Sequence, residues 1–247
     1  LTQSVTKSFT SALIGISISK GEIKSLDESI CKYLGEYKTK ACSEQNQSIT
    51  VRNLLTMTTG IDWNELEYDY HDERNTNNQC GSQPDPFDCV LSRKKTAAGG
   101  IHFAYNSMNH LMANYVLKES KAMGNARELK HRLLNPLGIN EVNTGNKSFG
   151  VIGDIALTPR GMMKFGLLYL NNGMWKGEPI IPAQWVKEST SAQVDLGNGE
   201  GYGYFWWTKQ FNVNGEQINC YYAWGYGGQY IFVVPSRNLV VTLTASN

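Results

Sequence analysis

The stretch Ser4-Val5-Thr6-Lys7 leads directly into a run in which apolar residues recur at Phe9, Ala12, Leu13 and Ile16. Recurrence at these offsets is typical of an amphipathic helix, and Gly21 predicts where that helix stops. Ser4 and Lys7 are three residues apart, so their side chains share one helix face. In the first turn, unpaired backbone N–H groups and the helix dipole favour negative charge. A hydroxyl beside an amine at this place is a candidate activated nucleophile.

The Ser-x-x-Lys spacing alone is a weak signal, because it occurs again at Ser17–Lys20, Ser29–Lys32 and Ser92–Lys95. The pair at 17–20 lies at the far end of the same predicted helix, where a lysine suits the dipole. The pair at 92–95 belongs to a basic run that is typical of a solvated loop. Only Ser4 combines the spacing with a helix N-terminus and a long apolar face, which makes it the candidate nucleophile.

Length and charge set the broad class of the protein. The 247 residues fit one large domain, or two lobes that share a site, and carry a net charge of only +1. Near-neutrality argues against a nucleic-acid partner, and no apolar run approaches the ~20 residues that span a bilayer. Because the chain begins at Leu1, close to the candidate nucleophile, we expect a processed or truncated piece, with any targeting segment outside it.

The five cysteines carry the prediction of cellular location. Cys31 and Cys42 bracket one short polar segment, and Cys80 and Cys89 bracket another. Two such locally spaced pairs indicate disulfides, Cys31–Cys42 and Cys80–Cys89, and therefore a periplasmic or secreted protein; free thiols in a cytosolic protein are the alternative. Cys220 is expected in a buried strand. The absence of a Cys-x-x-Cys motif gives zinc or redox chemistry no support.

Helical patterns fill the middle of the chain and strand patterns its end. Helices are expected at about 25–34, 50–57, 108–116, 128–134, 158–168 and 182–188, with a long irregular loop over 62–100. Strands are expected at 202–207, 230–234 and 239–244, and Asn214-Gly215 is a hairpin turn signal. Helices followed by an antiparallel meander indicate an α+β protein.

A Ser–Lys pair needs two further chemical groups. A protonated lysine cannot accept a proton, so a second proton-handling group is required, and Tyr105 is the best candidate because it ends an extended segment at a helix entrance. Acyl transfer also needs backbone N–H groups for the oxyanion. The run Gly225-Tyr226-Gly227-Gly228-Gln229 precedes a strand, and its glycines let a backbone approach a ligand. A packing tyrosine and a simple glycine-rich turn are the alternatives.

The three motifs in this order resemble the penicillin-recognising serine hydrolases, in their class C β-lactamase-like branch, which includes esterases and the 6-aminohexanoate-dimer hydrolase group. Leu54–Trp63, Leu157–Gly166 and Gly201–Trp207 also look like segments of this family. The resemblance implies a β-lactamase/transpeptidase-like fold, with an antiparallel sheet flanked by helices and a mostly helical lobe. The helical lobe would cover roughly 22–150 and the sheet side roughly 1–21 and 151–247. The family's N-terminal strands and helix and its C-terminal helix would be absent, leaving one face of the sheet uncovered.

By resemblance, Ser4 is the acylated nucleophile, Lys7 its proton partner and Tyr105 the residue that passes a proton to the leaving group. The N–H groups of Ser4 and Gln229 would form the oxyanion hole. The sequence departs from β-lactamases at two places in the predicted substrate site. Ser107 replaces an asparagine, and Tyr226-Gly227-Gly228 replaces Lys-Thr-Gly, which removes a cation.

The resemblance therefore implies a serine hydrolase that forms an acyl-enzyme on a small ester, amide or peptide-like substrate, without metal or cofactor. A β-lactamase or D-alanyl-D-alanine peptidase proper is one alternative, and a non-catalytic protein that binds penicillin or senses peptidoglycan is the other. Asp154 follows a glycine in a predicted loop, and its role stays open.

Overall fold

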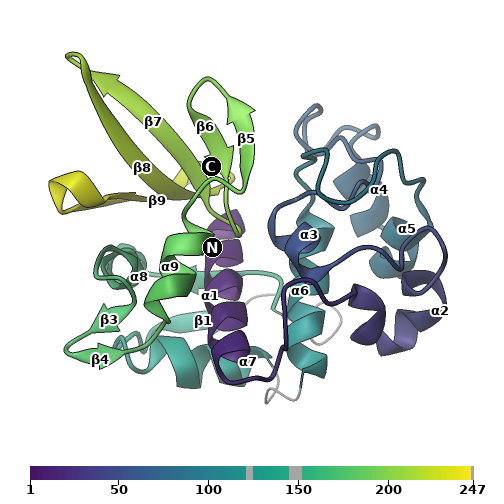
Figure 1. Ribbon diagram of the computed structural model, residues 1–247, viewed down its shortest axis with the longest axis horizontal. Coiled ribbons are helices and arrows are strands. Elements are labelled where there is room, and N and C mark those ends of the chain that lie inside the picture. Colours follow the sequence, from purple (N-terminus) through teal and green to yellow (C-terminus); the bar gives the residue numbers. More distant parts are fainter. Residues whose placement is uncertain (121–124, 145–151, 246–247) are drawn as a thin grey trace. The chain divides into compact units, whose positions relative to one another are not determined.

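The computed structural model (Figure 1) describes residues 1–120, 125–144 and 152–245. The chain divides into two compact units, the first made of Leu1–Glu22 and Ala122–Asn247 and the second of Ile23–Lys121. The second unit ends earlier than the residue 150 expected for the helical lobe. The reason is that the segment around Arg132 belongs with the first helix, where this guanidinium donates two hydrogen bonds to Glu22 at 2.7 and 2.8 Å.

The first unit is built around one buried helix. A 3-10 turn, η1 (Gln3–Val5), leads into α1 (Thr6–Ser19), and Gly21 follows the helix with a φ of 71°. Residues 6–17 are all buried, so α1 is a central helix rather than the amphipathic one expected. Small residues make this possible: a Cβ at Gly15 would lie 2.3 Å from Cγ of Trp185.

A six-stranded antiparallel sheet, in the order β10-β9-β8-β7-β6-β5, forms the C-terminal part of this unit. Its strands are β5 (Val194–Gly197), β6 (Glu200–Tyr202), β7 (Trp207–Val213), β8 (Glu216–Gly225), β9 (Gln229–Val234) and β10 (Leu239–Leu243). The hairpin between β7 and β8 turns at Asn214 and Gly215, with φ of 53° and 86°, as the Asn-Gly signal predicted. The meander expected for the C-terminal region is thus confirmed.

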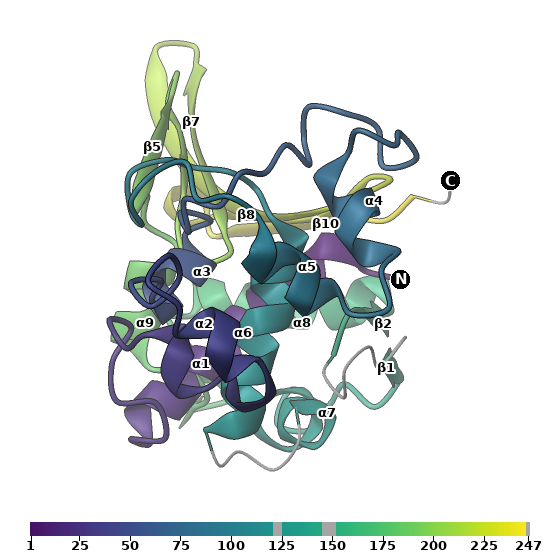
Figure 2. The same cartoon turned by 90° about the vertical axis from the view of Figure 1, so that its right-hand side faces the viewer.

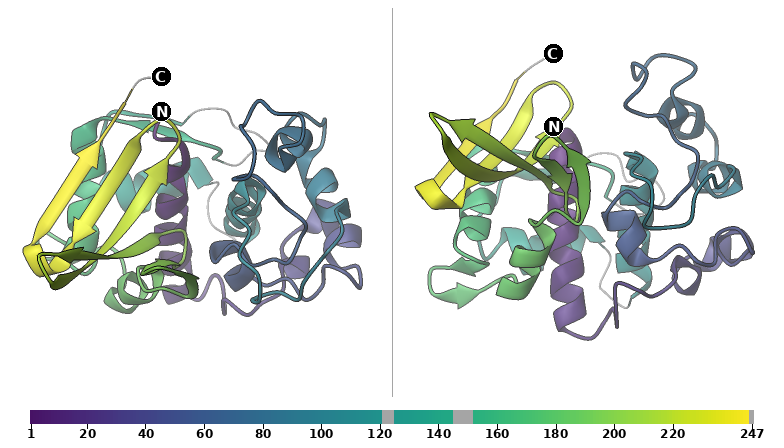
Figure 3. Two further views of the ribbon diagram at one scale, coloured as in Figure 1. Left: turned by 90° about the horizontal axis from the view of Figure 1, so that it is seen from above. Right: turned by 45° about the horizontal axis from the view of Figure 1, so that its top comes forward.

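The two faces of the sheet differ. One face packs on α8 (Pro159–Leu170) and α1 (Figure 3), and a Cβ at Gly166 would lie 2.6 Å from Cγ1 of Val240, so only glycine allows this close approach. On the other face, rings of Tyr222, Trp224, Tyr230 and Phe232 stack in a ladder with centroids 5.0 to 6.4 Å apart. Alternation along each strand places these residues, with half-exposed Leu239, Val241 and Leu243, opposite the helices. This second face is apolar and open.

The expected aromatic strand at 202–207 is a corner instead. β6 ends at Tyr202 and β7 begins at Trp207, with Phe205 between them at a φ of 59°. Tertiary packing produces the corner, because the rings between β6 and β7 are buried in the core. Trp206 stacks on Phe165, and Trp185 packs on Tyr204. The hydroxyl of Ser8 on α1 donates to the carbonyl of Phe205 at 2.7 Å.

The remaining elements of the first unit connect α1 to the sheet. They are α7 (Asn125–Glu128), the π-helical η4 (Leu129–Leu134), β1 (Val142–Thr144), β2 (Ile155–Leu157), β3 (Met174–Trp175), β4 (Glu178–Pro179) and α9 (Ala183–Ser189). β1 and β2 pair with each other (Figure 2). α8 begins as its sequence predicted, with Pro159 at the first position and the Thr158 hydroxyl accepting from the Gly161 N–H. The short η6 turn (Pro235–Arg237) connects β9 to β10. The described residues end at 245, shortly after β10.

The second unit consists of short helices held by side chains and disulfides. Its elements are η2 (Ile30–Lys32), η3 (Gly35–Tyr37), α2 (Lys38–Ala41), α3 (Val51–Leu55), α4 (Thr76–Gly81), α5 (Pro86–Ser92) and α6 (Ser107–Glu119). Of the helix expected at about 25–34, only the 3-10 turn η2 forms, with Ser29 as its cap. The helix expected from residue 50 does form, and Thr50 and Asn53 make a capping box on α3. The loop expected over 62–100 contains α4 and α5, which the Cys80–Cys89 disulfide joins. The Cys31–Cys42 disulfide is also present. Among the described residues, no helix combines the length and apolar character needed to cross a membrane.

Candidate active site

Ser4 and Lys7 are in direct contact where η1 passes into α1. Nζ of Lys7 donates a hydrogen bond to Oγ of Ser4 at 2.7 Å, and Lys7 is only 4% exposed. The other Ser-x-x-Lys pairs have different partners: Ser17 bonds Glu22, Lys32 pairs with Glu28, and Lys95 donates to Ser48. The residue before Ser4 is strained, because Gln3 adopts a φ of 52°. This strain turns the chain sharply just before the candidate nucleophile.

A hydroxyl and carboxylate cluster holds the Ser4 turn against β2. Thr6 donates to Oδ1 of Asp154 at 2.8 Å, and the same oxygen accepts the N–H of Ile155 at 2.7 Å. Thr2 donates both its N–H and its hydroxyl to the carbonyl of Ile155, each at 2.8 Å. The role of Asp154, which the sequence left open, is thus to fasten the residues on either side of Ser4 to the neighbouring strand.

The glycine-rich edge lies against the same turn. Gly225 closes β8 opposite Gln229, and Gly227 and Gly228 between them have φ of 76° and 91°. A Cβ at Gly225 would lie 2.4 Å from the carbonyl oxygen of Thr2 and 3.1 Å from Cβ of Gln3. Gly225 therefore lets the backbone just before Ser4 approach the end of β8. The first unit thus brings the predicted nucleophile and the predicted oxyanion segment together.

The side chain of Gln229 stabilises this edge from within. Its Nε2 donates to the carbonyls of Gly227 and Ala245 at 3.3 and 2.7 Å. An open pocket of about 530 Å³ adjoins the turn, and Gln3, Tyr226, Gly227, Gln229 and Ala245 are among its lining residues. The half-exposed ring of Tyr226 stands at the position where the resemblance implies a lysine in β-lactamases. The pocket therefore opens beside Gln3, the residue that precedes Ser4.

Tyr105 and Ser107 belong to the second unit, at the start of α6. The buried Tyr105 follows an extended segment in which the Ala104 N–H donates to the carbonyl of Met57 at 2.9 Å. Asn106 caps α6, its side chain accepting the N–H of Met108 at 2.8 Å. Met57 has a φ of 59°, which turns its carbonyl and its thioether toward this segment. Tyr105 is therefore held at a capped helix entrance, as its sequence context predicted.

Sequence reasoning missed Glu65, a buried carboxylate beside Ser107. Both the backbone N–H and the hydroxyl of Ser107 donate to it, at 2.7 and 2.6 Å. The indole N–H of Trp63, two residues earlier in the chain, donates to the same carboxylate at 3.0 Å. A glutamate in a polar loop gives no indication from spacing that it is buried.

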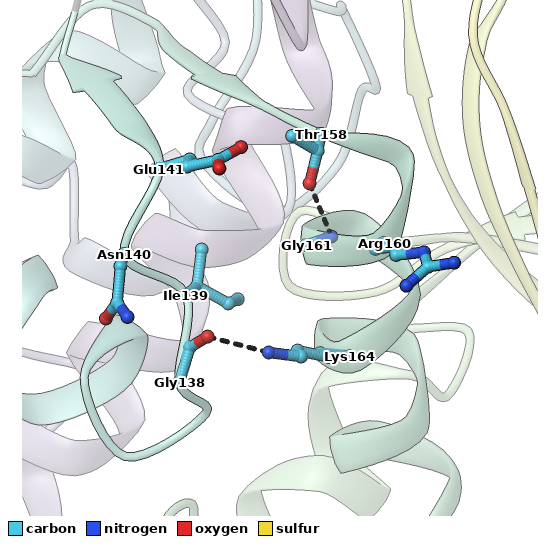
Figure 4. Close-up of a pocket in the computed structure, with 8 residues that line it drawn as sticks. All are labelled: Gly138, Ile139, Asn140, Glu141, Thr158, Arg160, Gly161 and Lys164. Carbon is cyan, nitrogen blue, oxygen red and sulfur yellow. Dashed lines mark hydrogen bonds between the residues drawn. The ribbon is translucent and has the colours of Figure 1, made fainter.

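A second pocket of the first unit, of about 300 Å³, lies between the segment after η4 and the start of α8 (Figure 4). Lys164 donates across it to the carbonyl of Gly138 at 2.6 Å, while Arg160 points away from that contact. Among the described residues, no group of three or more His, Cys, Asp or Glu side chains is placed to hold a metal ion. Cys220 lies buried in β8, where burial raises the pKa of its thiol to about 11, so it is not an activated nucleophile.

Three features together are typical of the β-lactamase-like fold. They are a serine–lysine pair at the start of a buried helix, an antiparallel sheet with a glycine-rich edge, and a helical second unit. The Beta-lactamase family model matches residues 2–247, and the chain belongs to this family. It is 22% identical to the 6-aminohexanoate-dimer hydrolase of Paenarthrobacter ureafaciens, over all of this chain and 66% of that protein.

Two solved structures have the same fold. A Bacillus anthracis protein assigned as a 6-aminohexanoate-dimer hydrolase is 20% identical with a TM-score of 0.79, covering 99% of this chain and 68% of its own. A D-stereospecific amidohydrolase from a Streptomyces species is 16% identical with a TM-score of 0.74, covering 97% of this chain and 79% of its own. The chain thus spans 66 to 79% of the length of these relatives.

Proposed function

We propose that this protein is a serine hydrolase that forms an acyl-enzyme on a small ester or amide substrate, with Ser4 as nucleophile. The observation that supports the proposal most directly is the 2.7 Å contact between Lys7 Nζ and Ser4 Oγ. A nucleophile within hydrogen-bond reach of a proton-handling partner is the arrangement that activated serines use. Burial of Lys7 keeps its amine directed at Ser4 rather than at solvent.

In the proposed reaction, Oγ of Ser4 attacks the substrate carbonyl and gives its proton to whichever of Lys7 and Tyr105 is deprotonated, as a neutral amine or a phenolate. The oxygen that becomes negative accepts hydrogen bonds from the N–H groups of Ser4 and Gln229, and such preorganised donors stabilise the transition state most. The bond to the leaving group then breaks, and Tyr105 passes a proton to that group. Water hydrolyses the acyl-serine by the same steps in reverse order. The proposal requires the phenol of Tyr105 to reach the reacting atoms when substrate is bound.

An ester or linear amide is a better candidate substrate than a β-lactam. Recognition of the β-lactam carboxylate uses a cation, and the segment Tyr226-Gly227-Gly228 has none. Several relatives also carry names of this kind: a 6-aminohexanoate-dimer hydrolase, a D-stereospecific amidohydrolase and a hydrolase with promiscuous acyltransferase activity. The two disulfides favour a periplasmic or secreted location for the activity.

A fluorophosphonate probe tests the proposal. The protein should be labelled at Ser4, and Ser4→Ala should abolish the label, whereas Ser92→Ala, which removes an exposed serine of the same spacing, should keep it. Turnover should be measured on short-chain nitrophenyl esters, a linear amide and nitrocefin, with the ester or amide preferred. If the protein shows neither labelling nor turnover, the interpretation as a non-catalytic binding protein replaces this one. Turnover of nitrocefin alone would identify a β-lactamase.

A further inference from the structure

Glu65 is the most completely coordinated carboxylate of the second unit's candidate site, and the reaction described above does not use it. Its side chain is 1% exposed. Oε1 accepts the hydroxyls of Ser107 at 2.6 Å and Tyr70 at 2.9 Å, and Oε2 accepts the Ser107 N–H at 2.7 Å and the Trp63 indole N–H at 3.0 Å. Four donors converge on two oxygens, so both oxygens of the Glu65 side chain are used as hydrogen-bond acceptors.

The segment that carries Glu65 is itself fixed. Nδ2 of Asn75 donates to the carbonyls of Glu65 and Tyr68 at 3.0 and 2.8 Å. Asn64 and Thr76 bond each other's backbone, with the Asn64 N–H on the threonine hydroxyl at 3.0 Å and the Thr76 N–H on the asparagine Oδ1 at 2.9 Å. The chain on either side of Glu65 is therefore tied to the start of α4, so the carboxylate is presented to Ser107 by a rigid support.

The hydrogen bond from the Ser107 hydroxyl to Glu65 determines whether this hydroxyl donates to or accepts from other groups. A serine hydroxyl has one proton and two lone pairs. Because that proton is donated to Glu65, the same oxygen can only accept a hydrogen bond from any other group it meets. The nearby negative charge makes it a stronger acceptor still.

We infer that Glu65 is a positioning residue that sets Ser107 as an obligate hydrogen-bond acceptor, so that the substrate group recognised there is an N–H donor. This inference rests on the proposed function and on the prediction, drawn from the resemblance, that Ser107 belongs to the substrate site. It narrows the substrate class to acyl groups that carry an amide N–H or an ammonium near the scissile carbonyl. A substrate with a carbonyl or carboxylate at that place would meet a lone pair instead.

Glu65→Gln provides a test because it can reverse the direction of the hydrogen bond between residue 65 and Ser107 without removing the contact that holds Ser107. The two N–H donors on Oε2, from Trp63 and the Ser107 backbone, cannot turn, so the oxygen of the introduced amide must take that side. The NH₂ group of this amide then faces the hydroxyls of Ser107 and Tyr70, which can rotate and accept. Ser107 would thereby accept a hydrogen bond from the introduced side chain and regain a proton to donate toward substrate.

The measurement is the ratio of kcat/KM for two matched esters, the para-nitrophenyl esters of N-acetylglycine and of O-acetylglycolic acid, which differ only in an N–H replaced by oxygen. The wild-type protein should prefer the N–H ester, and Glu65→Gln should lower that preference by about tenfold, the effect of one mismatched hydrogen bond. Glu67→Gln, at an exposed carboxylate of the same loop, should leave the ratio unchanged.

Ser107→Ala gives an independent measurement that leaves Glu65 in place. It should abolish the preference, and Glu65→Gln added to it should change the ratio no further. If Ser107→Ala keeps the wild-type ratio, or if Glu65→Gln lowers both esters equally, the inference is overturned. That result differs from failure of the proposed function, in which the wild-type protein would turn over neither ester.

Discussion

Two turns carry the proposed chemistry, one in each unit, and different kinds of contact hold them. The Ser4 turn lies against regular structure: Thr2 donates its N–H and its hydroxyl to Ile155 of β2, and Gly225 allows the end of β8 to approach. The Tyr105 turn follows a segment without regular strand pairing and is held mainly by side chains, above all the carboxylate of Glu65 on Ser107.

The comparison shows two ways to position a reacting group. In the first unit, Asp154 adds a carboxylate to an arrangement that a strand and a sheet already define. In the second, no sheet among the described residues lies behind Glu65, and helix caps and two disulfides hold the short helices together in addition to their buried apolar side chains.

The largest expected effect comes from the lysine of the first turn. Lys7→Met keeps an apolar stem in the buried site but removes the amine that contacts Ser4. We expect the rate of fluorophosphonate labelling and kcat/KM to fall by about 10³-fold, since a proton-handling partner contributes on this scale. Lys20→Met, at the exposed end of the same helix, is the control and should label normally. Labelling of Lys7→Met at a rate close to that of wild type would remove the amine from the mechanism.

The second turn should matter less, though clearly. Tyr105→Phe keeps the ring at the entrance of α6 and removes only its hydroxyl, so we expect kcat/KM to fall by about 10²-fold with little change in melting temperature. The matched control is Tyr68→Phe in the same unit, whose ring packs under Arg74. Equal activity of Tyr105→Phe and wild type would mean that Tyr105 serves only in packing, and the two turns would no longer share one reaction.

The disulfides should stabilise the second unit selectively. Replacing Cys80 and Cys89 by serine opens a short loop between α4 and α5, and we expect the free energy of unfolding to fall by about 2–3 kcal/mol. Denaturant unfolding of the double variant measures this loss. Thiol titration of the native wild-type protein should detect no reactive cysteine, because Cys220 is buried and its pKa is raised to about 11. Titration of all the cysteines without reductant would contradict both disulfides.

The same contrast explains which elements the sequence predicted. α8 and the hairpin between β7 and β8 follow from local rules, because a capped Thr158-Pro159 start and an Asn-Gly turn need no distant partner. The aromatic residues at 202–207 predict a strand but form a corner, because the packing of Trp206 on Phe165 determines their conformation. α4 and α5 were missed because they are short and owe their boundaries to the caps Asn75 and Asp85.

The candidate site divides in the same way. Ser4 and Lys7 could be proposed because their contact follows from a spacing of three residues where η1 continues into α1, and the oxyanion segment because glycines mark it in the sequence. Glu65 and Asp154 act across 42 and 148 residues of chain, on Ser107 and Thr6. No periodicity or motif in one sequence reports a contact of that range, so these two positioning carboxylates required the structure.

Acid should distinguish the units by the burial of one ion pair in each. In the first unit, hydrogen bonds from Arg132 hold the pKa of Glu22 below its usual value, against the opposing effect of burial; the side chains of Arg132 and Glu22 are 15% and 21% exposed. In the second, hydrogen bonds from Arg52 lower the pKa of Asp27, but that carboxylate is 67% exposed, so solvent screens the pair.

A depressed pKa contributes stability above the carboxyl's unfolded value and loses it as the pH falls through the folded value. The window for Glu22 therefore lies below about pH 4.5, the ordinary value for glutamate. Between about pH 6 and pH 3, the wild-type protein should lose about 1 kcal/mol more stability than Glu22→Gln, measured by denaturant unfolding at each pH. Asp27→Asn should follow the wild-type curve closely. If Asp27→Asn reduces the dependence of the unfolding free energy on pH and Glu22→Gln does not, the acid-sensitive contact belongs to the second unit, and the stability of the first unit depends less on pH.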